Sequence, residues 1–161
     1  SAKEIVDLFN KVMPPGSSQA LPVYEAGRNP VIERVSSFTA TANRIAELLV
    51  TSPLASHRTI GIITKLEADS IALHEHLSVV VPPELSLHLL TSQAKSYQGG
   101  ISVLPVTLAK GLEFDAVIIA NASAAEYGPG AFDARLLYVA LSRAMHSLYI
   151  LYQGTLTGLL R

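Results

Sequence analysis

The stretch that decides the fold runs from Pro105 to Ile119 and reads Pro-Val-Thr-Leu-Ala-Lys-Gly-Leu-Glu-Phe-Asp-Ala-Val-Ile-Ile. A polar turn at Lys110, Gly111 and Glu113 interrupts two apolar runs. Apolar runs of this length are typical of buried strands, so we expect the charged groups to lie where a buried strand leads into a loop. In open α/β sheets, that position is favoured for groups that bind ligands. The pattern therefore predicts a turn that faces a ligand.

A second informative stretch follows at residues 135–144, Arg-Leu-Leu-Tyr-Val-Ala-Leu-Ser-Arg-Ala. Its apolar spacing predicts a helix, and Arg143 lies at the end of the apolar run. A guanidinium group is permanently charged and offers a planar fork of donors to a phosphate. An arginine in this position therefore has the chemistry of an arginine finger.

Working outward from these stretches, strand patterns alternate with helix patterns along the chain, which predicts an α/β domain with a mostly parallel sheet flanked by helices. Residues 122–131 are rich in small residues, including Gly128-Pro129-Gly130, and predict a mobile loop. The predicted helices span residues 1–12, 39–51, 66–77 and 132–145, and the predicted strands span residues 31–38 at an edge, 59–64 in the centre, 85–91, 101–106, 116–120 and 147–152.

The length and composition are those of one domain. The chain has 161 residues, of which 49% are hydrophobic and only 16% are charged, against about 25% charged in an average domain. A parallel sheet covered on both faces accounts for such a composition, and so do apolar faces that meet missing neighbours. We expect both to apply, and we read residues 1–161 as one domain of a larger chain.

Composition also excludes several classes of protein. Without cysteine, the chain has neither disulfides nor thiolate metal sites. Its 12 basic and 13 acidic residues lack the positive excess of a nucleic-acid binder that acts alone. No apolar run is long enough to cross a bilayer, and the start does not read as a signal peptide, so we expect a cytoplasmic protein without a membrane partner.

We interpret the histidines and Tyr138 as structural residues and not as catalytic or metal-binding ones. His74 and His76 are two residues apart on a predicted helix, whereas a helical zinc pair needs a separation of four, so we interpret both as solvated surface residues. His146 is predicted to cap a helix end, and Tyr138 to pack in the core. We therefore predict no metal site within this chain.

Together, the two motifs closely resemble the fifth and sixth helicase motifs of the UvrD/Rep/PcrA branch of superfamily 1 helicases. The opening Ser1-Ala-Lys-Glu-Ile-Val resembles the segment that follows the family's Asn-Tyr-Arg-Ser motif, and Ile60-Gly-Ile-Ile-Thr-Lys resembles a strand of the same domain. The resemblance covers nearly the whole chain and implies the second RecA-like domain, which lacks the P-loop itself. Indeed, no Gly-x-x-x-x-Gly-Lys-Ser/Thr occurs in the sequence.

The resemblance also implies roles for five residues. Arg143 matches the arginine that reaches the γ-phosphate of ATP, which a missing N-terminal P-loop domain holds together with Mg²⁺. Glu113 matches a carboxylate near the nucleotide ribose, Gly111 permits close approach of the backbone, and Lys110 either contacts phosphate or is a solvated turn lysine. Thr107 stands where the family has a histidine, and its hydroxyl can donate to the backbone of single-stranded DNA.

Two departures from the family leave alternatives open. Thr107-Leu108 replaces a usual His-Ser pair, and residues 78–100 are too few to contain the large accessory domain of UvrD-type helicases. Both features resemble the HelD-like subgroup, whose members include proteins that use ATP to release RNA polymerase. The sequence therefore predicts the ATP-coupling domain of a DNA helicase, in itself inactive. A HelD-like factor that acts on RNA polymerase and a degenerate binding module remain the alternatives.

Overall fold

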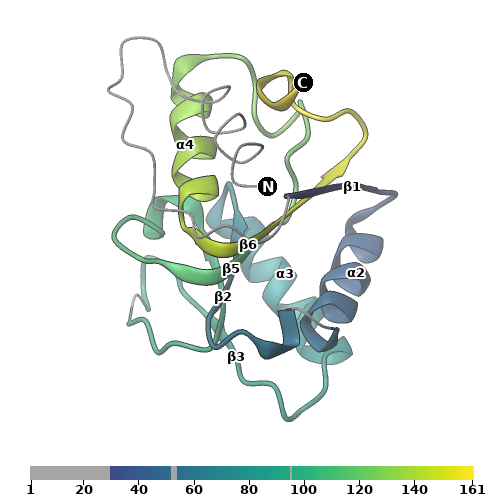
Figure 1. Cartoon of the computed structure of the whole chain (residues 1–161), viewed down its shortest axis with the longest axis vertical. Helices are drawn as coiled ribbons and strands as arrows, with labels where there is room; N and C mark the ends of the chain where they lie inside the picture. The colour runs from purple at the N-terminus through teal and green to yellow at the C-terminus, as the bar shows by residue number, and fades with distance from the viewer. Residues whose placement is uncertain (1–29, 52–53, 95) are drawn as a thin grey trace.

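The computed structural model describes residues 30–51, 54–94 and 96–161, and shows an α/β fold built on a six-stranded sheet (Figure 1). All neighbouring strands of the sheet are parallel, as predicted. The predicted helix over residues 1–12 and the resemblance of Ser1–Val6 lie outside the described residues. The elements are β1 (Val31–Val35), α2 (Phe38–Val50), β2 (Ile60–Thr64), α3 (Glu67–Val80), β3 (Leu87–Leu89), β4 (Ile101–Pro105), β5 (Phe114–Ile119), α4 (Ala131–Ser142) and β6 (Ala144–Gln153), with short 3-10 helices at Leu54–Ser56, Val106–Leu108 and Gly158–Leu160.

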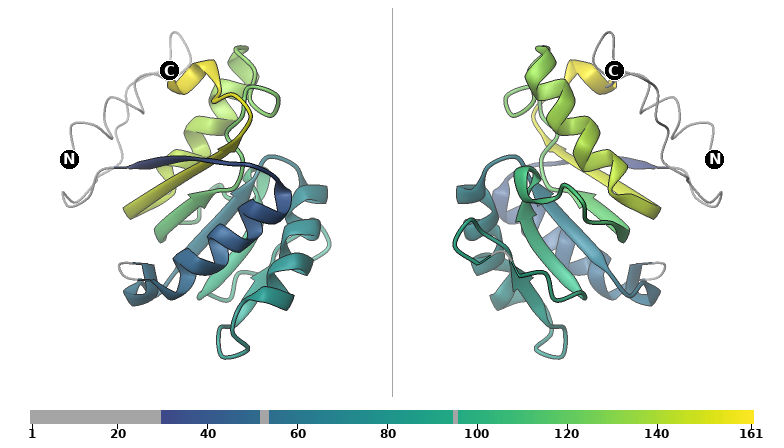
Figure 2. Two further views of the ribbon diagram at one scale, coloured as in Figure 1. Left: turned by 90° about the vertical axis from the view of Figure 1, so that its right-hand side faces the viewer. Right: turned by 90° about the vertical axis from the view of Figure 1, so that its left-hand side faces the viewer.

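The strands lie in the order β1-β6-β5-β2-β4-β3, and helices cover both faces of the sheet. Helices α2 and α3 lie on one face and α4 on the other (Figure 2). Side chains of a strand alternate between faces, so Ile62 and Ile118 pack against α2 and α3, whereas Ile63 and Ile119 pack against α4. The sheet is thus the middle of three layers, and its central strands are buried on both sides, which explains the apolar composition.

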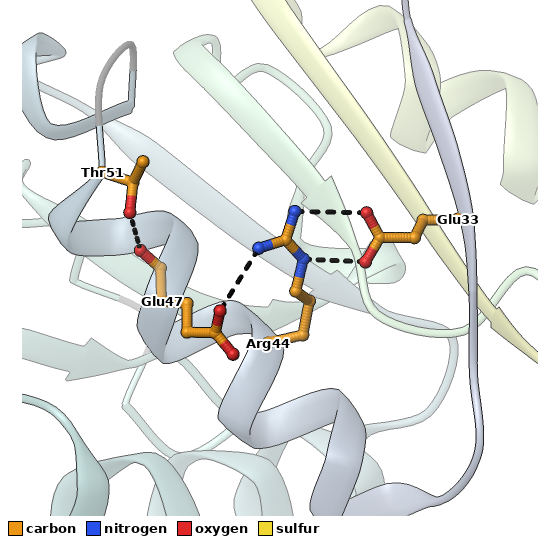
Figure 3. Close-up of polar contacts among 4 residues, drawn as sticks. All are labelled: Glu33, Arg44, Glu47 and Thr51. Atoms are coloured by element: carbon orange, nitrogen blue, oxygen red, sulfur yellow. Dashed lines mark hydrogen bonds and ion pairs between the residues drawn. The ribbon is translucent and has the colours of Figure 1, made fainter.

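An ion pair joins the edge strand β1 to α2, the helix that follows it. Arg44 of α2 donates from Nε to Oε2 of Glu33 at 2.7 Å and from a terminal nitrogen to Oε1 at 3.2 Å. A second carboxylate, Glu47, lies 3.5 Å from the same guanidinium, and Thr51 bonds the carbonyl of Glu47 where the helix ends (Figure 3). A bidentate arginine pair fixes geometry as well as charge, so it orients β1 on α2.

The boundary between α4 and β6 differs from the prediction. Helix α4 ends at Ser142, Arg143 is its C-cap, and β6 begins at Ala144, so the predicted helix through Met145 is too long. The carbonyl of Arg143 accepts a hydrogen bond from the backbone N–H of Phe114 at 2.9 Å, which starts the pairing of β6 with β5. His146 consequently lies in a strand, and its predicted helix-capping role is wrong.

The loop over residues 122–131, predicted to be mobile, is tied to the chain's C-terminal segment. The hydroxyl of Thr157 donates to the carbonyl of Tyr127 at 2.6 Å, and the N–H of Ala124 donates to the carbonyl of Thr155 at 2.8 Å. The side chain of Tyr127 is fully buried in the core on the α4 face. The segment is therefore anchored by these hydrogen bonds and by the buried Tyr127 ring, whereas several of its small residues are exposed.

Candidate functional site

The polar turn at residues 110–113 lies at the amino edge of the sheet. After β4, the 3-10 helix Val106–Leu108 and the turn lead the chain back along the α4 face to the start of β5. Val106 and Ala109 are buried in that face, so the short crossover is held by packing. The expectation that the turn simply follows a strand's carboxyl end is therefore wrong for Glu113, which immediately precedes β5.

The fold brings Arg143 beside this turn, although 30 or more residues separate them in the sequence. One terminal nitrogen of Arg143 donates to the carbonyl of Leu112 at 3.4 Å, and the other donates to the hydroxyl of Ser142 at 3.0 Å. The backbone bond between Phe114 and Arg143 fixes the start of β5 against the end of α4. The two sequence motifs thus form one site, which we call the amino-edge site, made of residues 110–113 and Arg143.

The guanidinium of Arg143 has unused hydrogen-bonding capacity. Its Nε atom is buried and has no partner among the described residues, and its contact with Leu112 is long. A buried donor without a partner costs free energy that an arriving acceptor recovers. Arg143 is only partly buried as a whole, so a shift of its side chain away from Leu112 would present the guanidinium to an anionic group such as a phosphate, whose oxygens accept from two of its nitrogens at once.

The other residues of the amino-edge site are open to solvent. Lys110, Gly111 and Glu113 are exposed. Gly111 has a φ of 81°, and a Cβ atom added there would meet no neighbour within 4 Å. Glycine is therefore suited to this position by its backbone conformation, and the space around it is free for an approaching ligand.

Thr107 lies apart from the arginine, on the 3-10 helix that directly follows β4, and its side chain is exposed. The next residue, Leu108, is partly buried against the core on the α4 face. Packing thus gives a physical reason for an apolar residue where the helicase motif usually has a polar one.

Neither histidine of the predicted surface pair is fully solvated. Both are partly buried: a ring nitrogen of His74 lies 3.2 Å from the carbonyl of Leu87, and the ring of His76 meets Phe38 edge-on. Within the described part of the chain, no group of three or more histidine, aspartate or glutamate side chains could hold a metal ion. Nor does the same part contain a helix long and apolar enough to span a bilayer.

Sequence reasoning missed a second polar cluster, at the carboxyl ends of β2 and β5. Lys65, directly after β2, donates to the carbonyl of Glu126 at 2.6 Å and pairs with Asp133 of α4 at 3.0 Å. Asp133 also accepts from the N–H of Gly128 at 2.8 Å. Burial alone would raise the pKa of Asp133, but the Gly128 bond and Lys65 outweigh it and lower this pKa. The only sequence signal was the polar Lys65 immediately after β2, because the residue that follows β5 is the apolar Ala120.

Glu126 has the opposite electrostatic environment. Burial, together with the charge of Asp69 and a hydrogen bond to it, raises the pKa of Glu126 above its ordinary value of 4.5. Stability from the protonated form is thus fully present below the unfolded-state pKa and is lost as pH rises through the folded-state pKa. Ionised Glu126 therefore weakens the fold near neutral pH.

We expect Glu126→Gln to raise the midpoint of thermal unfolding at pH 8, because glutamine keeps an amide donor for Asp69 and carries no charge. The difference from the wild type should vanish near pH 4, where Glu126 is already protonated. Thermal scans across this range check the prediction, with Glu75→Gln, an exposed carboxylate of α3, as a control that should change little at either pH. A lower midpoint at pH 8 would contradict this assignment.

Comparison with known proteins agrees with the resemblance of the two motifs to those of helicases. Residues 100–151, which include the amino-edge site, match the model of the UvrD-like helicase C-terminal domain. No curated protein sequence matches the chain. A solved structure that matches is the C-terminal domain of a possible DNA helicase from Lactobacillus plantarum WCFS1, with 30% identity, a TM-score of 0.77, and coverage of 99% of this chain and 90% of that one. The chain, with its RecA-like three-layer fold, therefore belongs to the family of UvrD-like helicase C-terminal domains.

Proposed function

We propose that this chain is the ATP-coupling domain of a DNA helicase or translocase and supplies an arginine finger to ATP held by an N-terminal P-loop domain. The observation that carries the proposal is the contact between the two motifs. Arg143 lies against the 110–113 turn through its bond to Leu112, and its Nε atom still lacks a partner among the described residues. A pre-positioned guanidinium with spare donors is suited to charge that develops on a transferring phosphoryl group.

Each residue of the amino-edge site has a part in this proposal. ATP with Mg²⁺, bound mainly by the N-terminal domain, supplies the phosphoryl group. Arg143 neutralises the charge on its oxygens, Glu113 accepts hydrogen bonds from the ribose hydroxyls, and the bare backbone at Gly111 lets the nucleotide approach. Lys110, exposed next to Gly111, adds a positive charge at the rim of the cleft.

Single-stranded DNA is the load that we propose for this motor. The structural relative is described as part of a possible DNA helicase, and the exposed hydroxyl of Thr107 is free to donate to a phosphate of the strand. Nothing in the comparisons favours RNA polymerase, and the packing of Leu108 against the core removes one reason for preferring it.

ATP turnover by the full-length protein tests the proposal. We expect single-stranded DNA to stimulate turnover, and we expect Thr107→Val to weaken that stimulation while the rate without DNA stays unchanged, because the variant removes only the hydroxyl donor. Stronger stimulation by RNA polymerase than by DNA would contradict the proposed load. Absence of turnover under all conditions would instead favour a degenerate binding module.

A further inference from the structure

A crevice of about 320 Å³ lies at the carboxyl edge of the sheet, at the opposite end of the strands from Arg143. It opens between β2 and β5, which are neighbours in the sheet. From β2 the chain continues into α3 on one face, whereas from β5 it continues into α4 on the other. Such a divergence is a topological switch point, where open α/β sheets form their ligand crevices. The crevice is lined by Phe38, Thr41, Thr64, Lys65, Leu66, Asp69, Leu73, Ala120, Asn121, Glu126 and Gln153.

Acidic groups dominate the charge of this crevice. Asp69 and Glu126 line it and are joined by a hydrogen bond. Among the described residues, Lys65 is the one basic side chain that lines the crevice, and its ammonium group already donates to the carbonyl of Glu126 and pairs with Asp133. Three carboxyl groups therefore share one cation, and the crevice has acceptor capacity left for a positive ligand.

The same features exclude a phosphate group as the ligand. Helix α3 points its N-terminus toward this edge, but its first turn carries Glu67 and Asp69, which offset the positive end of the helix dipole. The side-chain carboxylate of Glu67 also accepts a hydrogen bond from the backbone N–H of Ser92 at 2.6 Å. A phosphate entering here would meet carboxylates and a lysine that is already paired. The backbone of a nucleic acid is unsuited to the site for the same reason.

We propose that this crevice receives the guanidinium group of an arginine side chain presented by another protein segment, with Asp69 and Glu126 as its acceptors. The volume lies at the lower end of the range of about 300 to 1,000 Å³ for ligand pockets, which suits a single side chain. Phe38, which lines the crevice and is 41% exposed, supplies an aromatic face to the cation at the mouth. The carboxyl edge of the sheet would thus bind an arginine-bearing protein segment through charge complementarity.

Binding of the cation is coupled to the ionisation of Glu126. The charged groups facing Glu126 are Asp69 of α3, Asp133 of α4 and Lys65 after β2. Because burial and Asp69 raise the pKa of Glu126, the arriving guanidinium displaces a proton to solvent. Affinity should therefore increase as pH rises from about 5 to 8, in contrast to an ordinary surface pair of arginine and glutamate, whose carboxylate is already ionised over this range.

Saturation-transfer NMR on the full-length protein tests the proposal with the peptide N-acetyl-Gly-Arg-Gly-amide as the probe. Its citrulline counterpart is a neutral control of the same shape. We expect the arginine peptide to bind to the wild type. In the double variant Asp69→Asn, Glu126→Gln, the affinity for the peptide should be lower by about tenfold or more. Glu75→Gln, an exposed carboxylate on the same helix, should leave the affinity unchanged.

Several outcomes would overturn the proposal. Equal binding of the citrulline peptide would remove charge as the basis of recognition, and unchanged affinity in the double variant would place the cation elsewhere. Tighter binding of spermidine than of the arginine peptide would contradict a protein segment as the source of the cation. Tighter binding of cytidine than of the arginine peptide would indicate that the crevice receives a nucleobase instead of a guanidinium group. If the double variant fails to fold, two further measurements decide. Phe38→Ala still has to lower the affinity for the arginine peptide, and the wild type still has to bind this peptide more tightly at pH 8 than at pH 5.

Discussion

Replacing Arg143 with alanine should lower ATP turnover by the full-length protein roughly 10³- to 10⁵-fold, the range known for arginine fingers. The expected loss is large because the guanidinium acts where charge develops in the transition state. Lys110 is exposed at the turn and lacks the planar fork. For the same reason, Arg143→Lys should recover only a small part of the activity.

The structure predicts that this variant keeps its fold. The bonds that place Arg143 in the chain are made by its backbone, which donates to the carbonyl of Ala140 and accepts from Phe114. Within the described part of the chain, its side chain adds the bonds to Leu112 and Ser142 alone. Unfolding midpoints and ATP affinity should therefore change much less than the turnover number.

A matched control is available on the same helix. Arg135 of α4 is exposed and has the same side chain, but it lies two turns from the amino-edge site. Arg135→Ala should leave turnover within the normal range. Steady-state kinetics on both variants decide the matter, and near-normal turnover of Arg143→Ala would refute the assignment of the finger.

The second large effect is expected at Phe114, the first residue of β5. Its side chain is fully buried, and its ring meets that of Tyr97 edge-on with centroids 5.7 Å apart. Gly61 of β2 packs directly beneath the ring, since a Cβ atom there would lie 2.6 Å from it. Phe114→Ala should therefore open a cavity that the rigid sheet fills poorly and lower the free energy of unfolding by about 3 to 5 kcal/mol.

Hydrogen exchange of peptides from β5 and α4 in the full-length protein measures this loss locally. Because the N–H of Phe114 donates to the carbonyl of Arg143, exchange of this amide at the start of β5 should accelerate. Phe132→Ala is the control, since this phenylalanine is 66% exposed and surface substitutions usually change stability by less than about 0.5 kcal/mol. Equal protection in the two variants would contradict the packing described here.

The sequence was sufficient for the layers of this fold because its apolar runs are continuous. Strands such as Ile60–Thr64 are buried along their whole length, so their β-branched runs could be recognised without knowledge of the partner strands. The end of α4 could not be recognised in the same way. Ala144 and Met145 continue a helical pattern, and only pairing with β5, more than 25 residues earlier, turns them into strand.

The two functional regions differ in how far sequence reasoning could predict them. The amino-edge site comes from two compact motifs, so the pairing of Glu113's turn with Arg143 was foreseeable once the motifs were recognised. The crevice at the carboxyl edge is assembled from single residues that follow separate strands and helices, among them Lys65, Asn121 and Gln153. No local pattern marks such a set, because the sheet order alone brings its members together.

If the amino-edge site completes an ATP site that the N-terminal domain of the same chain begins, a structure of the full-length protein with a non-hydrolysable ATP analogue and Mg²⁺ should show the contact directly. We expect the terminal nitrogens of Arg143 to lie within about 3 Å of γ-phosphate oxygens, with the Glu113 carboxylate on the ribose side. A closed complex in which Arg143 remains on Leu112 and a different cation contacts the γ-phosphate would contradict it.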